Sequence, residues 1–309
     1  MPSEAFAILR HDSYASCDGS SCPKRPNRGL TKMSLTSFLK TTAIGRAILI
    51  PWRLKNALAT SLPPVGAAVT WAFRSREHYN FTYNLTERNK DYLAAFLSLV
   101  TKSSFAQAKA CLEEIEGDSG LRSQIAALGC QSDGRYITDR EVRYGRRIGW
   151  YALVRLLKPA CVIETGVDKG LGTAVLAAAI HRNAREGSPG KVVAIDINPA
   201  AGFLVGSELR KFVDFRFKDS LAALREFDRP VDIFIHDSNH SADHERLEYE
   251  AVQPRLSRNS LVVSDNAAHT GELLAYSLNT GREFLFFAEQ PKDHWWPGEG
   301  IGVAFNRCE

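Results

Sequence analysis

The chain has 309 residues, of which 44% are hydrophobic, so it can bury a full α/β core and still form a smaller extension. Its 39 Lys and Arg residues against 35 Asp and Glu give a formal charge of +4, which is too mild to indicate nucleic-acid binding. The 6 cysteines include no C-x-x-C pair, which argues against a zinc site or a disulfide scaffold. We expect a reduced, cytoplasmic interior and no nucleic-acid partner.

Residues 1–34 mix Ser, Pro, Gly and charged residues, and they contain no apolar run long enough for a signal peptide. This composition predicts a disordered leader. Met33 is a candidate for the true start of the protein.

Residues 35–73 are apolar with scattered Lys and Arg. The longest uncharged part, Asn56 to Phe73, is interrupted by Pro63 and Pro64 and falls short of the about 20 apolar residues that a membrane-spanning helix needs. We predict two amphipathic helices that cover a groove. Peripheral contact of residues 35–73 with a membrane surface is the alternative, because a basic, Trp-bearing helix also suits a lipid interface.

After an aromatic cluster (Tyr79, Phe81 and Tyr83), capping residues precede a predicted helix over residues 89–100. A further helical pattern covers residues 104–125, with an interruption from Gly117 to Gly120. We therefore predict that residues 35–140 form a helical extension or cap. An apolar extension of this kind commonly forms dimer contacts, so we expect a homo-oligomer.

From residue 141 onward, apolar strands alternate with helices, which is typical of a doubly wound, mainly parallel α/β sheet. The predicted helices cover residues 146–157, 173–180 and 242–256. The predicted strands cover residues 161–163, 191–196, 213–217, 231–236, 260–265, 283–287 and 300–305. Residues 141–309 thus form the main domain.

The stretch from Cys161 to Gly172, CVIETGVDKGLG, joins the first predicted strand to its helix. Glu164 follows the strand, and Gly166 and Gly170 supply the room for a tight turn beside a ligand. A dinucleotide site needs G-x-G-x-x-G, whereas the pattern here is E-x-G-x-x-x-G. An acid at this position suits a ligand with a positively charged amino group. An ordinary strand-to-helix turn is the structural alternative.

The next two strands also end in polar residues. Asp196 ends the second strand, where a carboxylate can accept both hydroxyls of a ribose. Asp219 and Ser220 follow the third strand, where an adenine ring would lie. Each is individually typical of the start of a polar loop, but their succession at neighbouring strand ends favours a nucleoside site.

The fourth and fifth strands end in IHDSNH and VSDN, which bring Asp237, His240, Asp265 and Asn266 to neighbouring strand ends. Two carboxylates and an amide oxygen are hard ligands suited to Mg²⁺. The structural alternative for the Asp residues is helix capping, and for His240 a position in the first turn of a helix.

In these motifs, residues 145–309 resemble the class I S-adenosylmethionine-dependent methyltransferases, in particular the metal-dependent, catechol O-methyltransferase-like branch. The resemblance implies a seven-stranded Rossmann-like sheet, S-adenosylmethionine and Mg²⁺. Asp237, Asp265 and Asn266 match the metal ligands, and His240 matches the general base. The base is lysine in catechol enzymes and histidine in the similar macrolide-sugar O-methyltransferases. The implied cofactor-binding residues are Glu164, Gly166, Gly170, Thr173, Asp196, Asn198, Asp219, Ser220 and Asp237.

Two features depart from the family pattern. Asp219 and Ser220 follow a lysine instead of the usual glycine, and the loop AEQPKDHWWPGEG is unlike a small catechol pocket. Trp295 and Trp296 suit stacking on a sugar or a flat ring, or else they form a surface loop packed on the core; His269 is a further candidate for substrate contact.

Together these features predict O-methylation of a saccharide or a glycosylated or secondary-metabolite acceptor. The alternatives are a catechol or phenol O-methyltransferase and a non-catalytic S-adenosylmethionine-binding protein.

Overall fold

The computed structural model describes residues 34–75, 77 and 81–306. The leader before Ser34, the candidate start Met33, and Tyr79 of the aromatic cluster lie outside these residues. The chain divides into two compact units, residues 1–58 and residues 59–309.

Helix α3 (Ile50–Arg74) corrects the prediction of a break at the proline pair, because it runs through Pro63 and Pro64 as one 25-residue helix. Neither proline donates a backbone hydrogen bond, so the helix continues through this pair without two of its hydrogen bonds. Two short helices precede it, α1 (Leu35–Thr41) and α2 (Ala43–Ile48). Among the residues that the structure describes, no helix is both long and apolar enough to cross a membrane.

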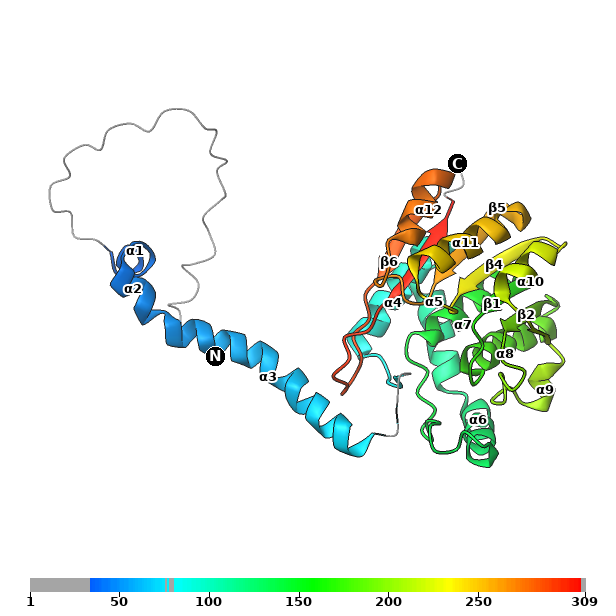
Figure 1. The fold of residues 1–309 in the computed structure, drawn as a ribbon, viewed down its shortest axis with the longest axis horizontal. Coiled ribbons are helices and arrows are strands. Elements are labelled where there is room, and N and C mark those ends of the chain that lie inside the picture. The colour runs from blue at the N-terminus through cyan, green and yellow to red at the C-terminus, as the bar shows by residue number, and fades with distance from the viewer. Residues whose placement is uncertain (1–33, 76, 78–80, 307–309) are drawn as a thin grey trace. The chain divides into compact units, whose positions relative to one another are not determined.

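Residues 59–309 contain the sheet and the helices packed on it (Figure 1). The remaining helices are α4 (Glu87–Thr101), α5 (Phe105–Glu116), α6 (Ser119–Gln131), α7 (Arg147–Leu157), α8 (Leu171–Arg185), α9 (Ser207–Arg210), α10 (Ser220–Glu226), α11 (Ala242–Val252) and α12 (Glu272–Thr280). The strands are β1 (Cys161–Thr165), β2 (Lys191–Asp196), β3 (Val213–Phe217), β4 (Val231–His236), β5 (Leu256–Ser264), β6 (Glu283–Phe287) and β7 (Ile301–Phe305).

The strands form one seven-stranded sheet in the order β3-β2-β1-β4-β5-β7-β6. Strands β1 to β5 are parallel, and β7 is antiparallel to both β5 and β6. The predicted doubly wound, mainly parallel sheet is therefore confirmed. Because β2, β1, β4 and β5 are neighbours and run the same way, the polar residues at their carboxyl ends meet along one edge.

The side chains of each strand alternate between two cores, as the pleat of a strand requires. In β1, Val162 packs with α4, α5, α7 and α8, whereas Ile163 packs with α10, α11 and α12. Helices α4 and α5, which come from the predicted extension, share the first of these cores. They are thus part of the layer that supports one face of the sheet.

Candidate functional site

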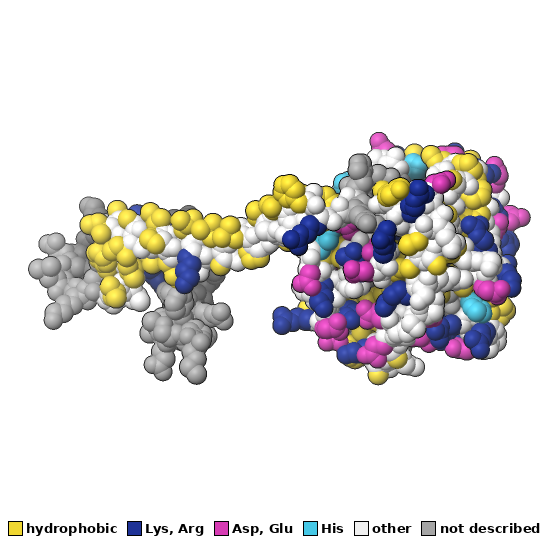
Figure 2. Space-filling view, turned by 90° about the horizontal axis from the view of Figure 1, so that it is seen from below, with side chains coloured by type: hydrophobic (Ala, Val, Ile, Leu, Met, Phe, Trp, Pro, Cys, Tyr) yellow, Lys and Arg dark blue, Asp and Glu magenta, His cyan; other side chains and the backbone are white. Residues whose placement is uncertain are grey.

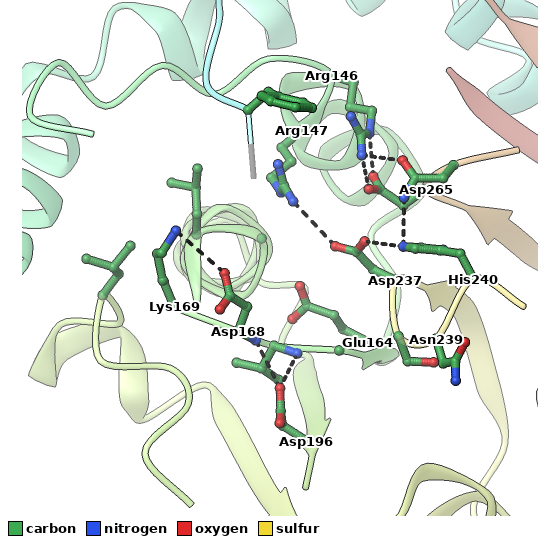
Figure 3. A pocket seen from close by; sticks show the side chains of 18 of the residues that line it. Arg146, Arg147, Glu164, Asp168, Lys169, Asp196, Asp237, Asn239, His240 and Asp265 are labelled. Carbon is green, nitrogen blue, oxygen red and sulfur yellow. Dashed lines mark hydrogen bonds and ion pairs between the residues drawn. The ribbon is translucent and has the colours of Figure 1, made fainter. Parts of the chain in front are cut away.

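A cavity of about 810 Å³ lies at the carboxyl edge of the parallel strands. This volume is within the range of small-molecule sites. Figure 3 shows side chains from the ends of β1, β2, β4 and β5 converging on it, together with two arginines from the start of α7. Of the residues predicted to bind cofactor, metal or substrate, the cavity is lined by Glu164, Gly166, Asp196, Asp219, Ser220, Asp237, His240, Asp265, Asn266, His269 and Trp296.

The turn after β1 needs glycine because the neighbouring strand end is too close for a side chain. Gly166 has φ +84°, and a Cβ there would lie 2.0 Å from the carbonyl oxygen of Asp237. Gly172 leaves room for Glu164, whose Oε1 would be 2.3 Å from a Cβ at that position. The motif therefore brings the β1 turn, the β4 end and the Glu164 carboxylate together.

Glu164 is buried at the end of β1, where Thr173 of α8 donates a hydrogen bond to its Oε2 at 2.5 Å. Burial raises the pKa of Glu164 to about 8, and the hydrogen bond from Thr173 opposes only part of that shift. At neutral pH the carboxyl group is thus mostly protonated when no cation lies beside it. A cationic amino group placed beside it would favour the ionised form.

This pKa leads to a first prediction. A ligand with an ammonium group that pairs with Glu164 should release close to one proton on binding near pH 7, because the carboxyl must ionise. Calorimetry with S-adenosylmethionine in buffers of different ionisation enthalpy measures this number, and Glu164→Gln should reduce it to near zero. Binding by the wild type without proton release would show that Glu164 does not meet the ammonium group.

Asp196 organises the turn as well as lining the cavity. Its Oδ2 accepts hydrogen bonds from the backbone N–H groups of Val167 and Asp168, each at 2.9 Å, and its Oδ1 accepts one from Asn198 at 2.8 Å. A carboxylate can accept about four hydrogen bonds, so one position on Oδ1 remains for a ligand. The neighbouring Ile197 is 76% exposed and also lines the cavity.

Three residues predicted to bind the cofactor do not line the cavity. They instead contact the residues and turns that form its wall. Thr173 is fully buried against Glu164. Asn198 closes the turn after β2 by accepting a hydrogen bond from Ala200. Gly170 packs against Gly202, whose Cα would lie 2.6 Å from a Cβ at position 170.

Asp219 and Ser220 lie at the start of α10. Asp219 caps the helix by accepting a hydrogen bond from the N–H of Ala222 at 2.9 Å. Ser220 Oγ lies 3.2 Å from His244 Nε2, and His244 in turn lies 3.1 Å from Glu248. Both residues line the cavity, but each is engaged by the protein.

Arg146, at the start of α7, occupies the centre of the acidic group that the sequence assigned to a metal. Its guanidinium makes a two-pronged ion pair with Asp265, with Nε donating to Oδ1 at 2.7 Å and Nη2 donating to Oδ2. Nη2 also donates to Asn266 Oδ1 at 2.7 Å. Figure 3 shows this guanidinium directed at the end of β5.

The far side of the same guanidinium is also paired inside the protein. Arg146 Nη1 donates to the hydroxyl of Tyr83 at 2.9 Å and to Glu289 Oε1 at 3.3 Å. Burial alone would raise the pKa of Asp265, but Arg146 outweighs it and holds this pKa well below its usual range. Arg146 is thus a fixed, buried cation at the edge of the sheet.

The contacts of Asn266 determine which form of His240 the site holds. The guanidinium of Arg146 can only donate hydrogen bonds, so the Asn266 atom that it contacts is the carbonyl oxygen. The amide nitrogen of Asn266 then faces His240 Nε2 at 2.7 Å. Because this amide can only donate, Nε2 must accept, and His240 is neutral with its proton on Nδ1. Burial, and next the charge of His236, lower the pKa of His240, in keeping with the neutral form.

Asp237 faces the same space as His240. Its Oδ1 lies 3.7 Å from His240 Nε2, and its Oδ2 lies 3.4 Å from Arg147 Nη2. Burial and the charge of Asp265 raise the pKa of Asp237. Arg147 therefore pairs with Asp237, its charge also lowers the pKa of Glu164, and its guanidinium lies over the Trp150 ring.

These contacts allow a test of whether the residues fit Mg²⁺. Both oxygens of Asp265 and the amide oxygen of Asn266 already accept hydrogen bonds from Arg146. A dication there would meet a buried guanidinium at close range, which costs free energy unless the arginine leaves. Among the described residues no group of three or more His, Cys, Asp or Glu could hold a metal ion. As arranged, the site does not fit a metal.

On the acceptor side, Trp296 and His269 line the cavity, whereas Trp295 lies in an adjoining aromatic cluster. Trp295 contacts the rings of Trp71 and Phe81 at centroid distances of 5.2 and 5.3 Å. The packed-loop alternative therefore describes Trp295. Trp296 packs on Phe81 at 4.9 Å, and both rings contribute to the cavity wall.

Arg146, Arg147 and Glu248 lie outside the predicted site residues. Glu248 is buried beneath the cavity and accepts hydrogen bonds from Thr165 at 2.7 Å and Ser238 at 2.8 Å. One sequence signal points to the arginines: they sit at the N-terminus of a helix, where the helix dipole disfavours cations. A pair of arginines there implies carboxylate partners elsewhere in the chain.

Residues 163–267 match the family model of a methyltransferase domain. This part of the chain is similar to a methyltransferase domain. The predicted resemblance to class I methyltransferases is confirmed, and with it the enzyme class, a methyl-transferring enzyme. No curated protein sequence is significantly similar to the chain.

Solved structures similar to this domain include three bacterial methyltransferases. The O-methyltransferase TomG from Streptomyces achromogenes, in complex with S-adenosylmethionine, has 16% identity over 62% of this chain and 91% of its own, with a TM-score of 0.44. A methyltransferase from Geobacter sulfurreducens has 23% identity over 59% and 88%, with a TM-score of 0.42. The O-methyltransferase from Bacillus cereus has 14% identity over 71% and 99%, with a TM-score of 0.41.

Proposed function

We propose that this methyltransferase transfers the methyl group of S-adenosylmethionine to a hydroxyl group, with His240 as the general base. The observation that carries the proposal is the chain of contacts from Arg146 through Asn266 to His240, which holds a neutral imidazole in the cavity. Glu164 and Asp196 line the same cavity as His240, so the residues proposed to bind the cofactor lie in one cavity with the proposed base.

The amino-acid end of S-adenosylmethionine suits two oppositely charged residues of this cavity. Glu164 would pair with the ammonium group, and Arg147, which lines the same cavity, would pair with the carboxylate. The ribose would use the remaining position on Asp196, and Ile197 would cover one face of the adenine. The chemistry of these side chains thus fits the whole nucleoside and its charged end.

S-adenosylmethionine, when bound, supplies a methyl group on a positively charged sulfur. The protein's task is to orient an acceptor hydroxyl for in-line attack and to take its proton, and orientation alone lowers such barriers by several kcal/mol. As the oxygen–carbon bond forms and the sulfur–carbon bond breaks, His240 Nε2 takes the proton from the hydroxyl. The acceptor hydroxyl must first replace the amide N–H of Asn266 at Nε2.

A fixed guanidinium at the end of β5 replaces the Mg²⁺ that the family resemblance implies. Arg146 keeps Asn266 oriented toward His240, so the protein itself maintains the base in its neutral form. Activity that depends on Mg²⁺ is the alternative, and it would require Arg146 to release Asp265.

The Asn266 contact gives a second prediction, in the pH profile. Asn266→Asp replaces the N–H donor at His240 with a carboxylate, which stabilises the imidazolium and should raise the pKa of His240 by about 1 to 3 units. Only neutral imidazole accepts a proton, so the rising limb of the rate should move to higher pH by the same amount. The rate of purified protein against pH measures the shift. An unchanged profile in this isosteric variant would separate His240 from the rate-determining proton transfer.

For the acceptor, we propose a saccharide or glycosylated hydroxyl. A catechol enzyme uses a metal to bind two adjacent oxygens, whereas this site offers a base for one hydroxyl and the aromatic wall of Phe81 and Trp296. Labelled methyl transfer from S-adenosylmethionine into glycan, macrolide-sugar and catechol pools tests the choice. Label in the sugar pools supports it, and label in catechols alone contradicts it. Binding of S-adenosylmethionine without transfer to any pool would favour a non-catalytic binding protein.

The cytoplasmic location and the homo-oligomeric state stay predictions. Sedimentation velocity of the full chain at several concentrations measures the second of these directly.

A further inference from the structure

We propose that helix α3 binds the surface of an anionic lipid membrane through an exposed apolar face. The helix has 25 residues, which corresponds to a length of about 37 Å. None of its residues is buried in the chain. A helix of this length with no buried residue needs a partner for any large apolar face that it carries.

Large apolar residues recur along α3 at intervals of three or four, so they form one face of the helix. Each of them is at least 41% exposed. The face, here called the α3 apolar face, consists of Ile50, Leu54, Leu58, Leu62, Val65, Val69 and Phe73. Figure 2 shows hydrophobic side chains gathered over this helix.

The opposite side of the helix carries polar and basic residues together with Trp52 and Trp71, of which Trp71 packs on Phe81 and Trp295. Arg53, Asn56, Thr60, Thr70 and Arg74 lie on that side by the helical repeat. From Ser34 to Ser75 every formal charge is positive, because the segment contains Lys and Arg but no Asp or Glu. An apolar face with a basic polar face and low overall hydrophobicity is the pattern of a helix that lies in a membrane interface.

Charge complementarity selects a lipid surface over a second copy of the chain. A second copy of the segment offers no acidic residue that could pair with these Lys and Arg side chains. An anionic leaflet supplies the opposite charge, and each Lys or Arg near it favours binding. The same leaflet buries the apolar face at the boundary of headgroups and acyl chains.

The test uses the full chain and sedimentation with phosphatidylcholine vesicles, with and without phosphatidylglycerol. The variant Leu62→Glu/Val69→Glu places two carboxylates on the α3 apolar face, and Thr60→Glu/Thr70→Glu adds the same charge to the polar face. The wild type should bind the anionic vesicles, and less strongly at high salt. The apolar-face variant should bind about tenfold or more weakly than its charge-matched control, because it alone loses the inserted side chains.

Three results would overturn the proposal. The first is a wild type that stays in the supernatant with anionic vesicles, and the second is equal binding by the two variants. The third is a wild-type dimer without vesicles that only Leu62→Glu/Val69→Glu dissociates, because the face would then belong to a second copy. Affinity for S-adenosylmethionine, measured on the same preparations, should be unchanged, so failure here is distinguishable from failure of the proposed methyl transfer.

Discussion

Replacing His240 with alanine is expected to lower turnover by about 10²- to 10⁴-fold, the usual contribution of a general base. The imidazole is the base that the Arg146 and Asn266 contacts hold neutral. The variant should therefore still bind S-adenosylmethionine, because Glu164, Arg147 and Asp196 are unchanged. Turnover and calorimetry on one preparation measure both quantities.

Two controls separate catalysis by His240 from a purely structural role. Added imidazole should restore part of the activity of His240→Ala, because it can enter the space of the missing ring and accept the proton. The matched variant His181→Ala, which removes an imidazole stacked on Phe212 away from the cavity, should keep its activity. Near wild-type turnover by folded His240→Ala would eliminate His240 as the base.

Replacing Arg146 with methionine is expected to lower the free energy of unfolding by about 3 to 5 kcal/mol, the usual cost of leaving a buried charge without its partner. Asp265 is fully buried, and Glu289 is 5% exposed, so neither can recover its lost contact from water. Urea denaturation measures the loss. Adding Asp265→Asn to the methionine variant should recover part of it, because the unpaired charge is then removed.

Arg143 offers a matched comparison for Arg146, since it makes the same two-pronged contact with Asp139 but is 33% exposed. Arg143→Met should cost less than Arg146→Met, because water screens the partly exposed Arg143 guanidinium, although Asp139 itself is only 9% exposed. A similar loss of unfolding free energy for Arg143→Met and Arg146→Met would show that the buried pair of Arg146 with Asp265 has no special role in stability.

The strands of the sheet were predictable because each is a short apolar run between turn residues, and β2, β3, β4 and β6 have the predicted bounds. The parallel order then placed Glu164, Asp196, Asp237 and Asp265 at one edge, since carboxyl ends of neighbouring parallel strands meet there. This part of the site follows from local pattern and chain direction alone.

The partner of Asp265 was not predictable in the same way. Arg146 is 119 residues away in the sequence, and only the packing of α7 on the sheet brings the two together. A carboxylate and an amide at a strand end look the same in sequence whether a metal ion or an arginine guanidinium faces them. The continuity of α3 through Pro63 and Pro64 was missed for a different reason, because proline restricts the backbone to an angle that a helix also uses.

The central claim, that a guanidinium and not a metal completes this methyl-transfer site, is tested most directly by the initial rate of labelled methyl transfer in EDTA. With an acceptor pool that takes up label, we expect the same rate in EDTA as with added Mg²⁺, because Arg146 already engages Asp265 and Asn266. A rate abolished by EDTA and restored by Mg²⁺ would contradict it.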